Sequence, residues 1–299
     1  MATSLRDVIR ETINTHLDAG YLVLGQCLTA VGWVANTLPQ RSKDMVELPC
    51  SDVAGAGFAV GVALAGRRPI YVIRYQGFNW FNAALIVNYA AKSKALWGRP
   101  CPLLIRSIAM EGGIGPVAGS SHHSLYYRMP GVKILSPMTP LEYRAAYKEF
   151  MDGDDVVYLS EHRKAYDNEH ELPALRPKCP EVVLFPISVT RFAAVQAARQ
   201  LAELDSSRQI AVHHIATLKP FTPTLEMLLD LRTAGAGIVL DDDYPDGVAK
   251  CIAHDLIQAS GVPDVAVMGL ENRTAGFSAQ VDNLPPTPEQ ILQFIESMI

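Results

Sequence analysis

The feature that most constrains the fold of this chain is the regular alternation of helical and strand-like segments. In the first half, helical stretches and short apolar runs follow one another at residues 5–17, 21–24, 54–65, 69–74, 83–94, 102–106 and 132–136. Strands separated by helices of this length are joined by right-handed crossovers into a mostly parallel sheet. We therefore predict an α/β fold for this part of the chain.

The alternation restarts after a polar, proline-containing stretch. The sequence HRKAYDNEHELPALRPKCP, residues 162–180, has the composition of a linker between compact units. Beyond it, strand-like and helical segments alternate again at 182–185, 193–204, 210–215, 225–233, 237–240, 248–260 and 265–268. We predict a first domain over residues 1–165, a linker over 166–180 and a second α/β domain over 181–299.

Composition excludes several classes of protein. With 49% hydrophobic and 19% charged residues, the chain is expected to be globular, and no stretch reaches the roughly 18 consecutive apolar residues of a membrane-spanning helix. The net charge of −5 and the lack of basic runs argue against nucleic acid as a partner, because neutralising phosphates takes clustered Lys and Arg. We expect a cytoplasmic protein that acts on a small molecule.

The cysteines do not predict a metal site or disulfides. Their number is odd, they lie far apart, and no pair has the spacing of a zinc site. We interpret all five as reduced thiols and predict no metal ligands in this chain.

The segment ELPCSDVAGAG suggests a carboxylate at the edge of the first sheet. A strand that ends at Glu47–Pro49 would deliver Ser51 and Asp52 to the start of a helix, where the helix dipole favours an acidic side chain. Open α/β sheets bind their ligands at such an edge. An ordinary helix cap is the alternative interpretation of Asp52. The small residues of the helix, between positions 54 and 61, would allow close packing against a neighbour or a second subunit.

An ordered series of blocks carries a resemblance to a known family. The longest block is ELPCSDVAGAGFAVGVALAGRRPIYVIRYQGFNWFNAALIVNYAAK, and it is followed by GGIGPVAGSSHHS, MPGVKILSPMTPLEYRAA, DDVVYLSEHRKAY, TLKPFTP, IVLDDDYPDGVAKCIAHDLI and LPPTPEQIL. Together they resemble the transketolase-like thiamine-diphosphate enzymes, and more narrowly the beta subunit of the decarboxylating component of 2-oxo acid dehydrogenases of the pyruvate, branched-chain and acetoin types. The resemblance implies a pyrimidine-binding parallel-sheet domain followed by a transketolase C-terminal-like α/β domain.

The resemblance also implies roles for residues in the first block. The position of Asp52 carries an acid in the family, normally Glu, which hydrogen-bonds the aminopyrimidine of thiamine diphosphate and stabilises the imino tautomer that deprotonates the thiazolium carbon. Asp is one methylene shorter, which moves the carboxylate back by about 1.5 Å and is expected to reduce the rate. Phe78 matches an aromatic residue stacked on the pyrimidine, with Tyr75 as a second candidate, and core packing is the alternative for both. Cys50 matches a position that contacts the pyrimidine edge.

Two further groups are interpreted through the resemblance. The family has a substrate-facing histidine in the loop that contains His122 and His123, and counting residues leaves open which of the two it is; a pair of surface histidines is the alternative. The triplet Asp241–Asp243 looks like a metal cluster, but the matching block implies acids that are solvated or lie at a subunit contact.

The family's magnesium motif is missing from this chain. Related enzymes hold the cofactor diphosphate through Mg²⁺ bound by a Gly-Asp-Gly motif and a later Asn, and the sequence contains no Gly-Asp-Gly. The resemblance therefore implies an alpha-type partner that carries this site, in an α2β2 assembly. It implies a subunit that decarboxylates a 2-oxo acid and transfers the acyl or hydroxyalkyl fragment. The alternatives are a split transketolase-like carboligase and a degenerate scaffold subunit, which the Asp in place of Glu keeps open.

Overall fold

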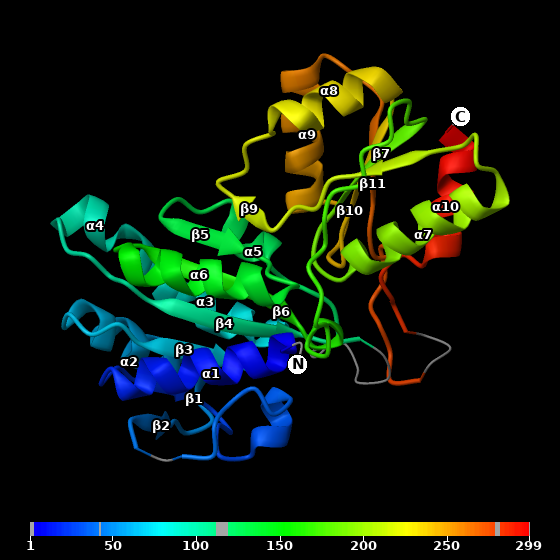
Figure 1. Ribbon diagram of the computed structural model, residues 1–299. Helices are drawn as coiled ribbons and strands as arrows, with labels where there is room; N and C mark the ends of the chain where they lie inside the picture. Colours follow the sequence, from blue (N-terminus) through cyan, green and yellow to red (C-terminus); the bar gives the residue numbers. More distant parts are fainter. Residues whose placement is uncertain (1–2, 42, 112–118, 279–281, 299) are drawn as a thin grey trace.

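The computed structural model describes residues 3–41, 43–111, 119–278 and 282–298, and it contains two sheets (Figure 1). The larger sheet has seven strands in the order β2-β1-β3-β4-β6-β5-β9. Their bounds are β1 Val23–Gly25, β2 Met45–Glu47, β3 Ile70–Ile73, β4 Leu104–Ala109, β5 Val132–Leu135, β6 Val156–His162 and β9 Thr217–Lys219. Every neighbouring pair is parallel except β5 and β9.

The smaller sheet has four parallel strands in the order β11-β10-β7-β8. These strands are β7 Val182–Pro186, β8 Ile210–Val212, β10 Gly237–Leu240 and β11 Val265–Met268. The two mostly parallel sheets with intervening helices confirm the predicted α/β fold.

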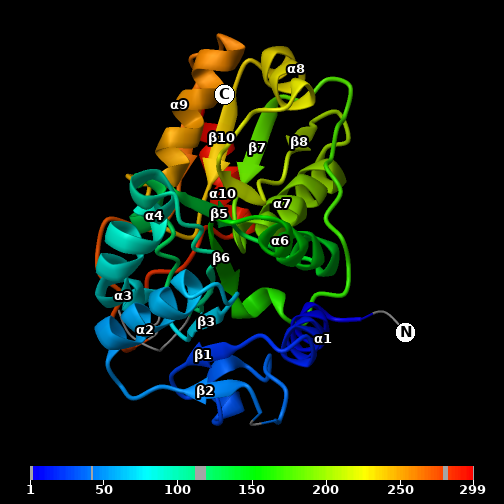
Figure 2. The same cartoon turned by 90° about the vertical axis from the view of Figure 1, so that its left-hand side faces the viewer.

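Helices cover both faces of the larger sheet (Figure 2). One face carries α1 (Leu5–Asp18) and α6 (Pro140–Asp152), whose buried side chains form one apolar cluster with the strands. The opposite face carries α2 (Asp52–Leu64) and the consecutive segments α3 (Asn79–Leu85), η3 (Ile86–Ala90) and α4 (Ala91–Trp97). A short helix, α5 (Ser124–Tyr127), precedes β5, and three short helical turns complete this part: η1 (Val31–Val34), η2 (Gln76–Phe78) and η4 (Arg163–Ala165).

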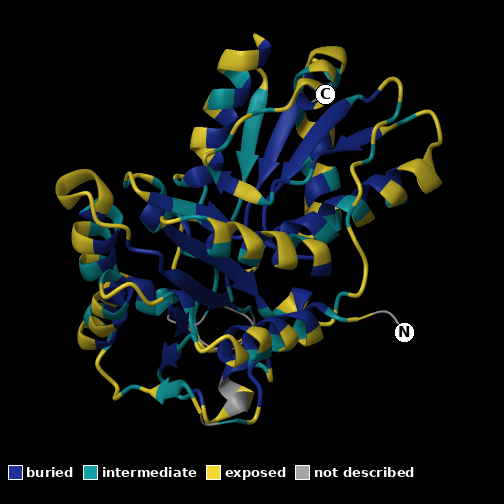
Figure 3. Ribbon diagram, turned by 60° about the vertical axis from the view of Figure 1, so that its left-hand side comes forward, coloured by how far each residue is buried: buried dark blue, intermediate teal, exposed yellow. Residues whose placement is uncertain are grey.

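The smaller sheet is covered by α7 (Thr190–Leu204) and α10 (Pro288–Met298) on one face and by α8 (Leu225–Ala234) and α9 (Val248–Ser260) on the other. Buried residues line the strands of both sheets, and exposed residues mark the outer faces of the helices (Figure 3). Among the described residues, no helix combines the length and the apolar character that crossing a membrane requires.

The sequence explains where the main helices begin. The Ser4 hydroxyl accepts a hydrogen bond from the Asp7 N–H at the start of α1, and the Thr139 hydroxyl does the same for Glu142 at the start of α6. In α2 the small residues are needed for packing, since a Cβ on Gly55 would lie 2.8 Å from the Tyr71 hydroxyl. The α2 helix therefore lies directly against β3.

The two parts of the chain share one core. Strand β9 comes from the predicted second domain but pairs with β5 of the first sheet, a crossing that the sequence did not predict. One apolar cluster also runs without a break from α2 and the larger sheet to α8 and α9. These contacts fix the loops of the two parts against each other.

Candidate active site

Loops that follow parallel strands meet at one edge of the larger sheet. Strands β1, β2, β3, β4 and β6 are all parallel, so the residues after their carboxyl ends converge. The predicted residues Cys50, Asp52, Tyr75, Phe78 and His122 all lie in or directly after these connections.

Asp52 is held by two amide side chains. It is the first residue of α2, and Ser51 precedes it as the N-cap without a side-chain hydrogen bond. The Oδ1 atom of Asp52 accepts hydrogen bonds from Gln26 Nε2 at 3.3 Å and from Asn82 Nδ2 at 3.1 Å. Within the described part of the chain, Oδ2 accepts none, so one oxygen is anchored and the other is available to a ligand.

Asn82 connects Asp52 to the aromatic residues. Its Nδ2 also donates to the Phe78 carbonyl at 2.9 Å, and its Oδ1 accepts from the Tyr71 hydroxyl at 2.7 Å. The rings of Tyr75 and Phe78 lie 5.9 Å apart, centre to centre. The acid and this aromatic pair are thus fixed relative to one another.

Arg74 packs over the aromatic pair. Its guanidinium lies 5.7 Å from the ring centre of Tyr75 and 5.6 Å from that of Phe78, within cation–π range. It also donates to the Cys27 thiol at 2.8 Å. Cys50 is an exposed free thiol, two residues before Asp52.

The two neighbouring histidines occupy different environments. The His122 ring is partly exposed and meets Trp80 edge-on at 6.4 Å, and burial lowers the pKa of its imidazole. Its backbone N–H donates to Gln76 Oε1 at 2.6 Å. His123 is fully buried, so His122 is the one of the pair whose ring reaches an open cavity.

His123 links the two parts of the chain. Its Nδ1 lies 3.1 Å from Ser160 Oγ, and its Nε2 lies 3.0 Å from Asp241 Oδ2. Although burial opposes charge on the ring, the Asp241 carboxylate raises the pKa of His123 to about 9. The raised pKa favours the protonated form of the His123 ring beside Asp241.

The expectation that Asp241–Asp243 are solvated or lie at a subunit contact is wrong. All three side chains are buried, because the end of β10 abuts the histidine loop of the first sheet. Ser121 Oγ donates to Asp242 Oδ2 at 2.7 Å, and the Ser124 N–H donates to Asp243 Oδ2 at 3.2 Å. Hydrogen bonds to these aspartates thus hold the loop that carries the histidines.

The cluster of His123, Asp241 and Asp242 also has the dimensions of an ion site. Potential ligand atoms of His123, Asp241 and Asp242 lie within 4.8 Å of one another. His123 Nε2 already pairs with Asp241, however, and Ser121 bonds Asp242. Burial and the neighbouring Asp241 raise the pKa of Asp242 to about 7, which reduces its charge. We assign the cluster to the domain contact.

Gln26, Arg74, Gln76 and Asn82 contribute to this site and were not predicted. Gln76 is completely buried, and its Nε2 donates to Ser160 Oγ at 2.9 Å while its Oε1 holds His122. The signal that could have found Gln76 and Asn82 is the presence of amide side chains in the otherwise apolar and aromatic stretch RYQGFNWFN.

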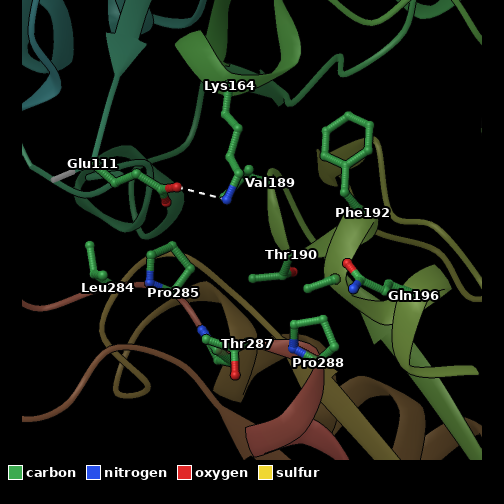
Figure 4. Close-up of a pocket in the computed structure, with 12 residues that line it drawn as sticks. Glu111, Lys164, Val189, Thr190, Phe192, Gln196, Leu284, Pro285, Thr287 and Pro288 are labelled. Atoms are coloured by element: carbon green, nitrogen blue, oxygen red, sulfur yellow. Dashed lines mark hydrogen bonds and ion pairs between the residues drawn. The ribbon is translucent and has the colours of Figure 1, made fainter. Parts of the chain in front are cut away.

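Two cavities lie near these residues. One, of about 430 Å³, is lined by His122 and is described below. The other, of about 190 Å³, opens where Glu111 and Lys164 face the start of α7 and residues 284–288 (Figure 4). Lys164 Nζ donates to Glu111 at 2.8 Å beside it. None of the predicted site residues lines this smaller cavity.

Residues 112–118 of the block GGIGPVAGSSHHS lie outside the described residues.

Comparison with known proteins agrees with this geometry. Residues 5–169 match the family described as "Transketolase, pyrimidine binding domain". The chain belongs to this family. The match covers more than half of the chain and includes the elements that carry Asp52, Phe78 and His122, and it confirms the resemblance of the sequence blocks.

Two curated relatives of this transketolase-family chain are beta subunits. The beta subunit of acetoin:2,6-dichlorophenolindophenol oxidoreductase from Cupriavidus necator is 26% identical over 220 residues, which are 67% of this chain and 63% of that protein. The 2-oxoisovalerate dehydrogenase subunit beta of Bacillus subtilis is 31% identical over 163 residues, 50% of this chain and 48% of that protein. The chain thus spans about half to just under two thirds of the length of these relatives.

A solved structure resembles the whole fold. It is described as "Split gene transketolase, inactive beta4 tetramer", and the superposition gives a TM-score of 0.75 over 100% of this chain and 98% of that one. The sequence identity is 14%, so this likeness shows the shared fold.

Proposed function

We propose that this chain is the beta-type subunit of a two-chain thiamine-diphosphate enzyme that decarboxylates a 2-oxo acid and transfers the acyl or hydroxyalkyl fragment. The observation that carries the proposal is the Asp52 carboxylate, anchored through one oxygen at the sheet edge beside Phe78. The family membership and the two beta-subunit relatives support it.

The residues at the sheet edge fit an aminopyrimidine. A flat heterocycle needs an aromatic surface and an acid beside it. Phe78 and Tyr75 supply aromatic rings, and Asn82 links Asp52 to the Phe78 carbonyl. Asn82 holds Asp52 and the Phe78 carbonyl with the same amide nitrogen, so the acid is positioned before a ligand arrives. Cys50 is close enough in sequence to border the ring.

The chain's own residues suit proton transfer. When bound, the cofactor supplies an electron sink for cleavage of the bond next to a carbonyl. Asp52 would hold a proton at a ring nitrogen through Oδ2, while Gln26 and Asn82 keep Oδ1 in place. Burial lowers the pKa of the His122 imidazole, which favours the neutral ring, and a neutral ring can accept or relay a proton of the substrate. Gln76 fixes the backbone of His122.

A second polypeptide would complete this site. The sequence has no Gly-Asp-Gly motif for the diphosphate and Mg²⁺, and we assign these to an alpha-type partner in an α2β2 assembly. Helices α2, α3 and α4 with η3 expose large apolar side chains that such a partner would cover, each at least 50% exposed: Val53, Phe58, Trp80, Phe81, Tyr89, Leu96 and Trp97.

Co-expression with an alpha-type chain tests the proposal. The purified complex is offered thiamine diphosphate, Mg²⁺ and a panel of 2-oxo acids, and release of carbon dioxide is measured. Turnover of at least one acid that depends on the cofactor supports the proposal. Turnover only of a ketose phosphate with an aldehyde acceptor would indicate the split carboligase, and a stable complex without turnover of either kind would indicate a scaffold subunit.

A further inference from the structure

The cavity beside His122 has the dimensions of a small-molecule site. Its volume is about 430 Å³, within the range of about 300–1,000 Å³ typical of ligand pockets. Aromatic and apolar side chains form much of its wall, with a few polar groups among them: Trp80, His122, Ser124, Leu125, Tyr127, Arg128, Asp243, Tyr244, Asp246, Gly247, Val248 and Cys251.

Both parts of the chain build this cavity, and hydrogen bonds join its walls. The Ser124 hydroxyl accepts from the Val248 N–H at 3.0 Å, and the Ser124 N–H donates to Asp243. Gly247 allows the close approach, because a Cβ there would overlap the Ser124 hydroxyl. The cavity is therefore formed in advance, and little ordering is needed when a ligand binds.

One charged group in the wall has no partner among the described residues. Asp243 accepts hydrogen bonds from the Ser124 and Tyr244 N–H groups, and Asp246 pairs with Lys250 at 2.6 Å. The guanidinium of Arg128, in contrast, makes no hydrogen bond or ion pair with any residue that the structure describes. A guanidinium presents a planar set of donors that matches a carboxylate or a phosphate.

We propose that this cavity binds the end of the substrate remote from the reacting carbonyl, and that Arg128 pairs with an anionic group there. The inference rests on the proposed function, since it takes His122 to face the reacting carbonyl. A substrate of this class carries a carboxylate or phosphate at its far end and a short carbon chain that packs against Trp80 and Tyr127.

Binding of unreactive anions to the full-length chain tests the site directly. Glutarate and glycerol 3-phosphate serve as carboxylate and phosphate probes, glycerol is the neutral control, and the NMR signals of the His122 ring and the Trp80 indole N–H report binding. At least one probe is expected to shift both signals. In Arg128→Met its affinity should fall about 10–100-fold, the contribution of a charged hydrogen-bonded pair.

The matched control is Arg99→Met, which removes an exposed arginine outside the cavity. It should bind the probe like the unmodified chain. Equal affinity in Arg128→Met, or the same shifts with glycerol, would overturn the inference. The relative affinity of the two probes identifies the anion.

Turnover separates this inference from the proposed function. In the assembled enzyme, Arg128→Met should raise KM much more for a substrate with a remote anion than for a substrate without one. Active enzyme that is indifferent to Arg128 for both substrates would overturn the inference alone. Probe binding that depends on Arg128, in an assembly without turnover, would keep the anion site and reject the proposed function.

Discussion

At the scale of single residues, the site depends on amide and acidic side chains whose partners lie far away in the sequence. Asp52 is anchored by Gln26 and Asn82, and His123 pairs with Asp241 across 118 positions. The sequence pointed to Asp52 because it follows a recognisable strand at the start of a helix, and to the aromatic stretch and the histidine pair through the resemblance of their blocks to the family. It could not show that the aspartates of one part face the histidines of the other, since no local pattern encodes that contact.

Replacing Asp241 with Asn is predicted to lower the pKa of His123. Asp241 is the main group that raises this pKa to about 9 against the effect of burial, and Asp242 and Asp243 add to it. An Asn at position 241 removes the largest effect that raises this pKa, while the opposing effect of burial stays, so the pKa should fall well below 9. A pH titration of the His123 ring signals by NMR measures the change, and an unchanged midpoint would show that the pair does not form.

The stability of the folded chain should also depend on pH through the pairing of His123 with Asp241. The pKa of His123 is higher in the folded chain than in the unfolded one, so its pairing stabilises the fold fully below about pH 6.5 and is lost as the pH rises through about 9. Near pH 6, the free energy of unfolding of the unmodified chain should be larger than that of Asp241→Asn by on the order of 3 kcal/mol. Above pH 9 the difference should be smaller. The exposed Asp264→Asn is the control. A difference that grows with pH would contradict the assignment.

At the scale of elements, alternation in the sequence predicted most of the long helices and most strands, but α6, α10 and β6 were not among the predicted segments. Strand β9 was not predicted, because it has three residues and its antiparallel partner β5 lies some eighty positions earlier. Such a pairing depends on tertiary contacts and not on local propensity. The sequence likewise did not predict the burial of Asp241–Asp243 at the end of β10, because this burial depends on their contact with the histidine loop.

The junction of α9 and α5 tolerates no side chain at Gly247. A Cβ there would overlap the Ser124 hydroxyl and lie 2.9 Å from the Ser124 Cβ. Gly247→Ala should therefore destabilise the chain by about 1–3 kcal/mol and shift the NMR signals of His122. The control is Gly61→Ala in α2, where a Cβ meets nothing within 4 Å and stability should be equal or higher. Equal stability of the two variants would refute the close contact.

A buried ion pair joins β4 and β6. Arg106 contacts Glu161 through two hydrogen bonds of 2.7 and 2.8 Å, and both side chains are almost completely buried. Arg106→Met leaves the Glu161 charge without its counter-ion, so we expect a loss of about 3–5 kcal/mol in chemical unfolding. Lys148→Met, which breaks an exposed pair with Asp152, should cost less than about 0.5 kcal/mol. Similar losses in free energy of unfolding in Arg106→Met and Lys148→Met would contradict the expected difference between the buried and the exposed ion pair.

At the scale of the whole molecule, the exposed apolar side chains of α2, α3, η3 and α4 form the surface that we propose an alpha-type partner covers. Phe58→Arg places a charge on this surface and should abolish co-purification with the alpha-type chain while the isolated subunit stays folded. Leu204→Arg, on the distant α7, is the control, because Leu204 is 80% exposed and lies outside this surface. Retention of the complex in Phe58→Arg would place the contact elsewhere.

Activation of the cofactor by Asp52 is the central claim. Deuterium exchange at the reactive carbon of bound thiamine diphosphate, followed by NMR in the assembled complex, measures that activation before any substrate is added. In Asp52→Asn the exchange should be at least about 100-fold slower, as expected for loss of a positioned proton-transfer group. In Asp52→Glu, which restores the longer acid of the family, exchange should be at least as fast as in the unmodified complex. Exchange in Asp52→Asn as fast as in the unmodified complex would contradict the account.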